Sequence, residues 1–127
     1  MPDYVVQRLT VALNERELPV RGRRILLLGL AYKRNTGDAR ESPARRVAEQ
    51  LIGLGADIVI ADDHVRDEQI PVGARRVACT ADEVAAADAV VLLVDHDNID
   101  LELVHEHAGY VLDTRAVLDD APHLERL

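Results

Sequence analysis

The chain has 127 residues, enough for one domain with a sizeable core, and this core must be aliphatic because the sequence contains no Trp or Phe. A formal net charge of −8 argues against general nucleic-acid binding, since phosphate backbones repel an acidic protein. The single cysteine, Cys79, excludes a disulfide framework and favours a reducing cytoplasm, and the sequence shows neither a signal-peptide pattern nor an apolar run of membrane-spanning length.

The first predicted element is an amphipathic helix over residues 4–16. Its apolar positions recur at helical spacing, and they are Val5, Leu9, Ala12 and Leu13. Pro19 and Gly22 interrupt this pattern, so the helix is expected to end before them and to be joined to the next element by a short linker.

Residues 25–28 form an uninterrupted aliphatic run, which predicts a central parallel strand that is buried on both faces. Gly29 ends the run, and Ser42 followed by Pro43 is typical of a helix start. A loop between a strand and a helix start directs backbone N–H groups and the positive end of the helix dipole to its mouth, where an anion can bind.

Lys33 lies in this loop and is the only lysine in the chain; Arg34 and Arg40 lie in the same loop. A lone lysine in the one loop shaped for a phosphate favours an anion-binding role. A solvated surface lysine is the alternative interpretation.

The rest of the chain predicts further strands separated by helices. Aliphatic runs indicate strands at residues 58–61, near 76–78, at 89–94 and at 110–113. Helices are predicted over about 43–54, after a capping box at Thr80 and Glu83, and near 101–105, and the final residues are predicted to be a loose tail. This alternation predicts an α/β fold: a Rossmann-like, doubly wound, mainly parallel sheet of about five strands with helices on both faces, preceded by an N-terminal helix.

In such sheets, ligands bind beyond the carboxyl ends of the strands. Four polar segments are expected there, namely residues 29–42, 62–64, 95–97 and 114–115. Two of them carry cations and two are acidic. A ligand with phosphates at one side and hydroxyl groups at the other would suit both signs.

Several motifs of nucleotide and metal sites are absent from the sequence. The residues after Gly29 do not form G-x-G-x-x-G, so the usual NAD turn is not expected, and there is no P-loop pattern. The five histidines show no metal-ligand spacing. Cys79 lies at a strand end without a catalytic motif and is interpreted as a small apolar residue.

A set of joined motifs resembles the C-terminal domain of the UDP-glucose/GDP-mannose dehydrogenase family. The sequence GLAYK at residues 29–33, followed by DARESP at 38–43, is similar to the family's signature. Further similar segments are MPDYVV at 1–6, GAD at 55–57, ADDHV at 61–65, DAVV at 88–91 and VLDTR at 111–115. Within ADDHV, the family more often has proline where this chain has Asp63.

The resemblance implies a division of the chain and a function. Residues 1–22 would be a helix and linker from the central dimerisation region, and residues 23–127 a nucleotide-sugar (UDP) binding domain. In the family, an upstream domain binds NAD and supplies the catalytic cysteine and lysine, and the full enzyme oxidises the sugar C6 alcohol to a uronic acid. We therefore expect no oxidation by this fragment alone, which lacks those parts, and a homo-oligomer for the full-length enzyme.

The resemblance also implies which residues bind the UDP-sugar. Tyr32 and Lys33 match the family's aromatic-lysine pair, and Arg115 matches the arginine after the last strand. Arg40 matches the arginine of the Arg-Glu-Ser-Pro segment, and bracing of the loop through Asp38 is its alternative role. The amino-acid sequence of the 29–43 loop most resembles the bacterial amino-sugar branch of the family, with UDP-N-acetylglucosamine or UDP-N-acetylmannosamine as substrate.

The sequence is compatible with two other functions. Asp62, Asp63 and Asp95 at strand ends are compatible with a receiver-like signalling domain that binds Mg²⁺, although the first strand is followed by no acidic pair. The third function is a structural dimerisation module that pairs through the 4–16 helix, in which Leu9→Asp would disrupt self-association.

Overall fold

The computed structural model describes residues 2–127, so Met1, the first residue of the MPDYVV segment, lies outside the described residues. One sheet of six strands runs through the molecule in the order β3-β2-β1-β4-β5-β6, and every neighbouring pair is parallel. The strands are β1 (Arg24–Leu28), β2 (Asp57–Ala61), β3 (Ala74–Arg76), β4 (Ala89–Leu92), β5 (Val111–Asp113) and β6 (Leu124–Arg126). The helices are α1 (Pro2–Glu15), α2 (Pro43–Gly53), the 3₁₀ turn η1 (Asp67–Gln69), α3 (Ala81–Ala86) and α4 (Leu101–His107).

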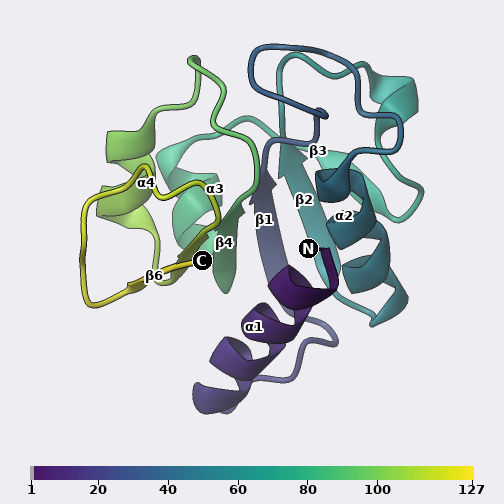
Figure 1. The fold of residues 1–127 in the computed structure, drawn as a ribbon. Helices are drawn as coiled ribbons and strands as arrows, with labels where there is room; N and C mark the ends of the chain where they lie inside the picture. The colour runs from purple at the N-terminus through teal and green to yellow at the C-terminus, as the bar shows by residue number, and fades with distance from the viewer. Residues whose placement is uncertain (1) are drawn as a thin grey trace.

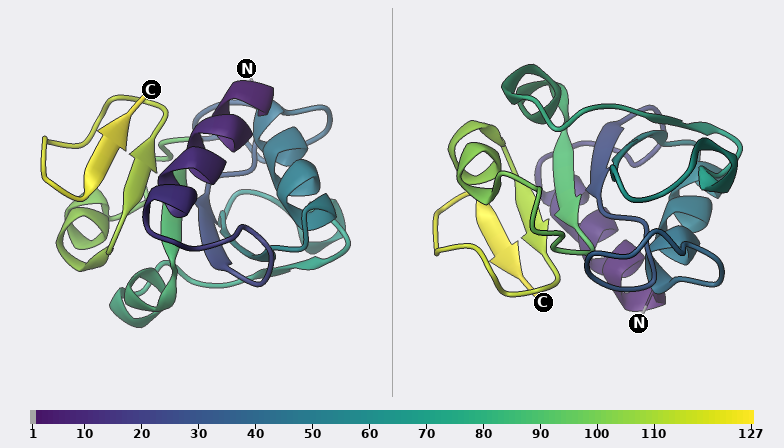
Figure 2. Two further views of the ribbon diagram at one scale, coloured as in Figure 1. Left: turned by 90° about the horizontal axis from the view of Figure 1, so that it is seen from below. Right: turned by 90° about the horizontal axis from the view of Figure 1, so that it is seen from above.

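Helices cover both faces of the sheet, as Figures 1 and 2 show. Successive residues of a strand point to opposite faces, so Ile25 and Leu27 of β1 pack with α1 and α2, while Leu26 and Leu28 pack with α3 and α4. All four side chains are fully buried. The α/β fold with a parallel sheet covered on two faces is thereby confirmed.

The order of the strands reverses at β1. From β1 the chain moves outward to β2 and β3, then returns to place β4 on the other side of β1. Such a switch point opens a crevice beyond the strand ends, because the two connections leave in opposite directions. The loops after β1 and β4 meet at this point, and in Figure 1 they lie at the top of the view.

Helix α1 belongs to the same core as the sheet. Its residues Val5, Leu9 and Leu13 are buried in one apolar cluster with β1, β2 and α2. The helix is also tied to β6, because the Arg8 guanidinium pairs with Glu125, which also accepts a hydrogen bond of 3.1 Å from the Tyr110 hydroxyl. Residues 2–127 contain no helix that is both long and apolar enough to cross a bilayer.

Several sequence predictions differ from the structure: the helix predicted over 4–16 is Pro2–Glu15, and the strand predicted over 89–94 is Ala89–Leu92. The predicted loose tail is wrong: Leu124–Arg126 is the sixth strand, which pairs with β5. The predicted strand near 76–78 begins and ends earlier, as β3. The capping box is only half formed, because the Thr80 side chain accepts the Glu83 N–H while the Glu83 carboxylate pairs with Arg24 instead of returning to the cap.

Candidate functional site

A cavity of about 240 Å³ opens at the carboxyl edge of the sheet. Three residues that were predicted to bind ligand, Tyr32, Lys33 and Arg115, line this cavity together. They come from two loops, one after β1 and one after β5. The remaining wall is mostly apolar and comes from α1, α2, the residues just after β4 and the same two loops: Pro2, Val5, Ala31, Pro43, Ala44, Val47, Leu93, Val94 and Thr114.

The loop after β1 is fixed at both of its ends. Gly29 has a φ of 91°, which side-chain-bearing residues rarely adopt, and a Cβ added there would lie 2.5 Å from the Cβ of Val94. At the other end, the buried Ser42 hydroxyl donates to the Leu30 carbonyl (2.7 Å) and accepts the Arg45 N–H (2.9 Å). The N-cap of α2 therefore also closes the loop.

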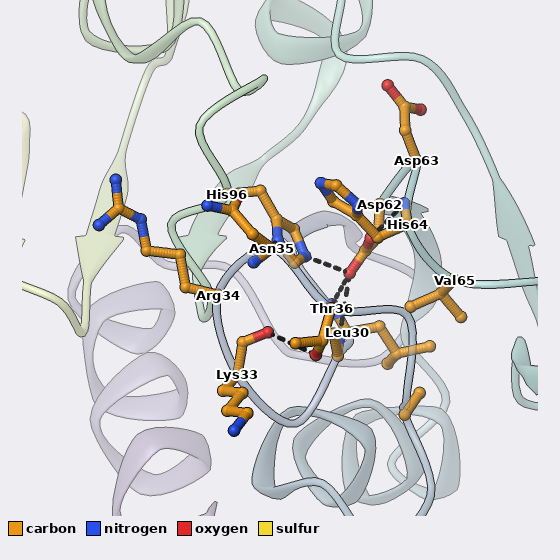
Figure 3. A network of polar contacts seen from close by, with 12 residues as sticks. Leu30, Lys33, Arg34, Asn35, Thr36, Asp62, Asp63, His64, Val65 and His96 are labelled. Atoms are coloured by element: carbon orange, nitrogen blue, oxygen red, sulfur yellow. Dashed lines mark hydrogen bonds and ion pairs between the residues drawn. The ribbon is translucent and has the colours of Figure 1, made fainter.

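Asp62, directly after β2, holds the start of this loop. Its side chain is buried and accepts the backbone N–H groups of Leu30 (2.7 Å) and Ala31 (3.1 Å), as well as that of His64 (2.9 Å). His96 contacts the same carboxylate through Nε2 at 2.9 Å. Figure 3 shows this network, in which the Lys33 side chain points away from Asp62. Asp62 is thus occupied by protein donors and shapes the site without facing a ligand.

We expect Asp62→Asn to lower the free energy of unfolding at neutral pH by about 2–4 kcal/mol, because one amide nitrogen would then face N–H donors. Burial raises the pKa of Asp62, but its hydrogen bonds from Leu30, His96, His64 and Ala31 outweigh this and lower the pKa overall. The carboxylate therefore stabilises the fold above the unfolded-state pKa of about 3.9, and this stabilisation is lost as the pH falls through the lower folded-state pKa.

Urea unfolding of both proteins across the acid range measures this effect, and the difference between wild type and Asp62→Asn should shrink below about pH 4. Asp63→Asn is the matched control, since Asp63 is exposed and, among the described residues, its carboxylate accepts a hydrogen bond only from the Asn98 side chain. A difference that stays constant down to the acid limit would contradict the assigned role of the carboxylate.

A second buried carboxylate shapes the Arg115 loop. Asp113 ends β5 with no exposed surface and accepts the N–H groups of four successive residues, 115–118, at 2.8–2.9 Å. The Arg115 guanidinium is oriented by its Nε, which donates to Asp95 at 3.2 Å. Within residues 2–127, the Nη groups of Arg115 donate to no acceptor, so these donors remain available for a ligand.

The polar segments expected at the strand ends do meet. Residues 29–42 contact residues 62–64 through Asp62 and residues 95–97 through Arg34, whose side chain pairs with Asp97. Residues 95–97 in turn contact Arg115. Cationic and acidic segments thus neutralise each other in part, while no carboxylate of residues 2–127 pairs with the Lys33 ammonium group.

A model of the UDP-glucose/GDP-mannose dehydrogenase family, UDP binding domain, matches residues 26–120. The chain belongs to this family. The UDP-N-acetyl-D-mannosamine dehydrogenase of Methanococcus maripaludis strain C7 is 34% identical over 98 residues, which are 76% of this chain and 21% of that protein. The UDP-glucose 6-dehydrogenase of Bos taurus is 33% identical over 121 residues, covering 79% of this chain and 24% of that enzyme.

Solved structures of the dehydrogenase family share the fold. A UDP-D-ManNAc dehydrogenase from Pyrococcus horikoshii aligns over 98% of this chain and 30% of its own, with a TM-score of 0.75 and 24% identity. The chain therefore spans between a fifth and a third of the length of these relatives.

Arg40 lies apart from the other predicted residues of this UDP-glucose/GDP-mannose dehydrogenase domain. It lines a different hollow, with Gly37, His64 and Arg66, and its guanidinium pairs with Asp38 at 3.2 Å. This geometry corresponds to the alternative role, in which Arg40 braces the loop. The pair raises the pKa of Arg40 and lowers that of Asp38, chiefly through the side-chain hydrogen bond.

The strand-end carboxylates that suggested a Mg²⁺ site bind other groups of this chain instead. Asp62 is buried under protein donors, and Asp95 accepts from Arg115. The described residues contain no group of three or more His, Cys, Asp or Glu side chains that is able to hold a metal ion. Cys79 packs against the apolar cluster of α3 and α4, and burial raises the pKa of its thiol, which disfavours a nucleophilic thiolate.

Sequence reasoning missed the supporting side chains of the site. In the sequence, Asp113 belongs to the VLDTR segment and His96 to a polar strand end, and neither position predicts a supporting role. The available signal was a polar residue at or shortly after the end of an aliphatic strand. The contribution of Pro2 and Val5 to the cavity wall carried no signal, because it depends on how α1 docks on α2.

Proposed function

We propose that this chain is the nucleotide-sugar-binding domain of an NAD-dependent UDP-sugar 6-dehydrogenase. Membership of the family supports the class, and the cavity supports the site, because it joins Lys33 and Arg115 on one rim. The full enzyme would oxidise the sugar C6 alcohol to a carboxylate. This change removes two hydrides, which two NAD+ molecules accept, and adds one oxygen atom from water; the NAD+ would be bound by a domain outside these residues.

The chemistry of the three residues fits a nucleoside diphosphate. Lys33 would act as a compact positive charge on a phosphate, and Arg115 would offer its Nη groups as a planar fork. The Tyr32 side chain is 60% exposed and presents an aromatic face at the mouth of the cavity. Local cations are needed here, because the chain as a whole is acidic and would repel an anion.

The remaining parts of the proposal concern the larger enzyme. Residues 1–22 would continue the central dimerisation region, and residues 23–127 would close the active site against the NAD domain of the same enzyme, in a homo-oligomer. Single-cysteine usage supports a cytoplasmic location. An N-acetylated amino sugar is the favoured substrate, and several relatives carry UDP-N-acetyl-D-mannosamine in their names.

Calorimetric titration of the chain with UDP tests this function. We expect saturable binding that weakens as salt is raised, and an affinity about tenfold or more lower in Lys33→Ala, because a charge-assisted hydrogen bond to phosphate is lost. Arg66→Ala is the matched control and should bind as the wild type does, because the exposed Arg66 does not line the cavity. Unchanged affinity in Lys33→Ala, or binding of Mg²⁺ without binding of UDP, would contradict the proposal.

A further inference from the structure

His96 is a buried histidine that the proposed binding site does not use directly. It follows β4, is 2% exposed, and contacts the loop that carries Lys33 through the backbone of Asn35. Its ring makes two hydrogen bonds: Nε2 contacts Asp62 Oδ2 at 2.9 Å, and Nδ1 lies 2.8 Å from the backbone nitrogen of Asn35. The imidazole thus joins the end of β2 to the tip of the loop.

These two contacts fix the position of the imidazole proton. A backbone N–H can only donate, so Nδ1 must present its lone pair to Asn35. The proton of the neutral ring then lies on Nε2 and is donated to the Asp62 carboxylate. The opposite tautomer would set an N–H against the Asn35 N–H and leave Asp62 without this donor.

The loop turns sharply at Asn35 and is held there by several hydrogen bonds. Asn35 has a φ of 59°, in the left-handed region that asparagine adopts more readily than most residues with a side chain. Its side chain exchanges two hydrogen bonds with Asp97, donating from Nδ2 to Oδ2 (2.9 Å) and accepting the Asp97 N–H (3.0 Å). The Thr36 hydroxyl donates to the Lys33 carbonyl (2.9 Å), which closes a tight turn around residues 33–36.

We propose that His96, as its Nε2–H tautomer, is a positioning residue for the anion-binding loop. It holds the Asn35 end of the turn while Asp62 holds the Leu30 end, and the backbone of Lys33 lies between these two anchors. The ammonium group is therefore presented to the cavity by a preorganised loop, and less ordering is needed on binding. This role rests on the proposed function, since it concerns the affinity of the same site.

Two variants separate the two contacts of His96. In His96→Asn, the amide oxygen lies near the place of Nδ1 and can still accept the Asn35 N–H. In His96→Gln, the longer side chain can reach Asp62 but has no acceptor at the position of Nδ1. We expect UDP affinity to fall about tenfold in His96→Gln and to stay within about threefold of wild type in His96→Asn.

His64→Gln is the matched control. The His64 ring is a close neighbour of His96, with 4.4 Å between the ring centroids, but His64 is exposed and is not expected to affect UDP binding. Thermal melting of each variant, followed by circular dichroism, shows whether the chain is folded. A folded His96→Gln that binds UDP as tightly as wild type would overturn the proposal.

The tautomer is measured without any ligand. In ¹⁵N NMR of the free chain, the His96 ring should show a protonated Nε2 and an unprotonated Nδ1, and hydrogen exchange of the Asn35 amide should be slow in wild type and fast in His96→Gln. An Nδ1–H ring, or equal exchange rates, would refute the positioning role. Absence of UDP binding in wild type would refute the proposed function, while the tautomer and exchange data would still decide the role of His96 in the loop.

Discussion

Leu9→Asp is expected to lower the free energy of unfolding by about 4 kcal/mol or more, enough to unfold much of the protein. Leu9 is fully buried in the cluster that α1 forms with α2 and the sheet. Aspartate would remove this apolar contact and place a carboxylate where no partner is available. The measurement is urea unfolding followed by circular dichroism.

Val11→Asp is the matched control for this prediction, since Val11 lies on the same helix with 38% of its surface exposed. Its effect should stay within about 0.5 kcal/mol. The two results together also test the dimerisation alternative. If the Leu9→Asp protein keeps the wild-type stability but no longer self-associates, Leu9 lies in an interface between chains. This result would contradict its burial in the core of a single chain.

Gly29→Ala is expected to destabilise the chain by about 3 kcal/mol or more, through backbone strain and overpacking together. The φ of 91° disfavours any Cβ, and the added atom would lie 2.6 Å from the Val94 carbonyl oxygen and 2.8 Å from the Val94 nitrogen. These are backbone atoms just after β4, so they cannot rotate away as the end of a flexible side chain would. The contact between the loops that follow β1 and β4 should be lost, and the cavity should be lost with it.

Gly53→Ala is the control, because Gly53 lies in α2 and an added Cβ would meet nothing within 4 Å. It should leave the stability unchanged or raise it by less than about 1 kcal/mol, because alanine has the higher helix propensity and Gly53 is the last residue of α2. Calorimetric melting of both variants measures the contrast. A Gly29→Ala protein with the wild-type melting temperature would show that the β1 and β4 loops can move apart at little cost.

The central elements of the fold were predictable because their signals are local. The strands β1, β2 and β4 are solid aliphatic runs, as buried parallel strands require, and Ser42-Pro43 marks the start of α2. Strand β6 was missed because it has three residues, and one of its contacts, between Glu125 and Arg8, joins positions 117 residues apart. No local pattern carries such a contact.

The candidate site was predictable to a similar depth. The motifs around Lys33 and Arg115 placed both residues at strand ends, and parallel strands bring their carboxyl ends to one edge. The structure joins Tyr32 to them but places Arg40 in another hollow. The roles of Asp62, Asp113 and His96 depend on which backbone N–H groups surround each side chain, and this is fixed only by tertiary structure.

Helix α1 forms part of the cavity wall through Pro2 and Val5, while its other apolar residues are packed on the sheet. A ligand that fills the cavity and contacts this wall binds only the chain in which the helix is seated. By thermodynamic linkage, ligand occupancy and seating of the helix must then favour each other by the same factor. A force that pulls α1 away from α2 would therefore lower the affinity of the cavity for its ligand.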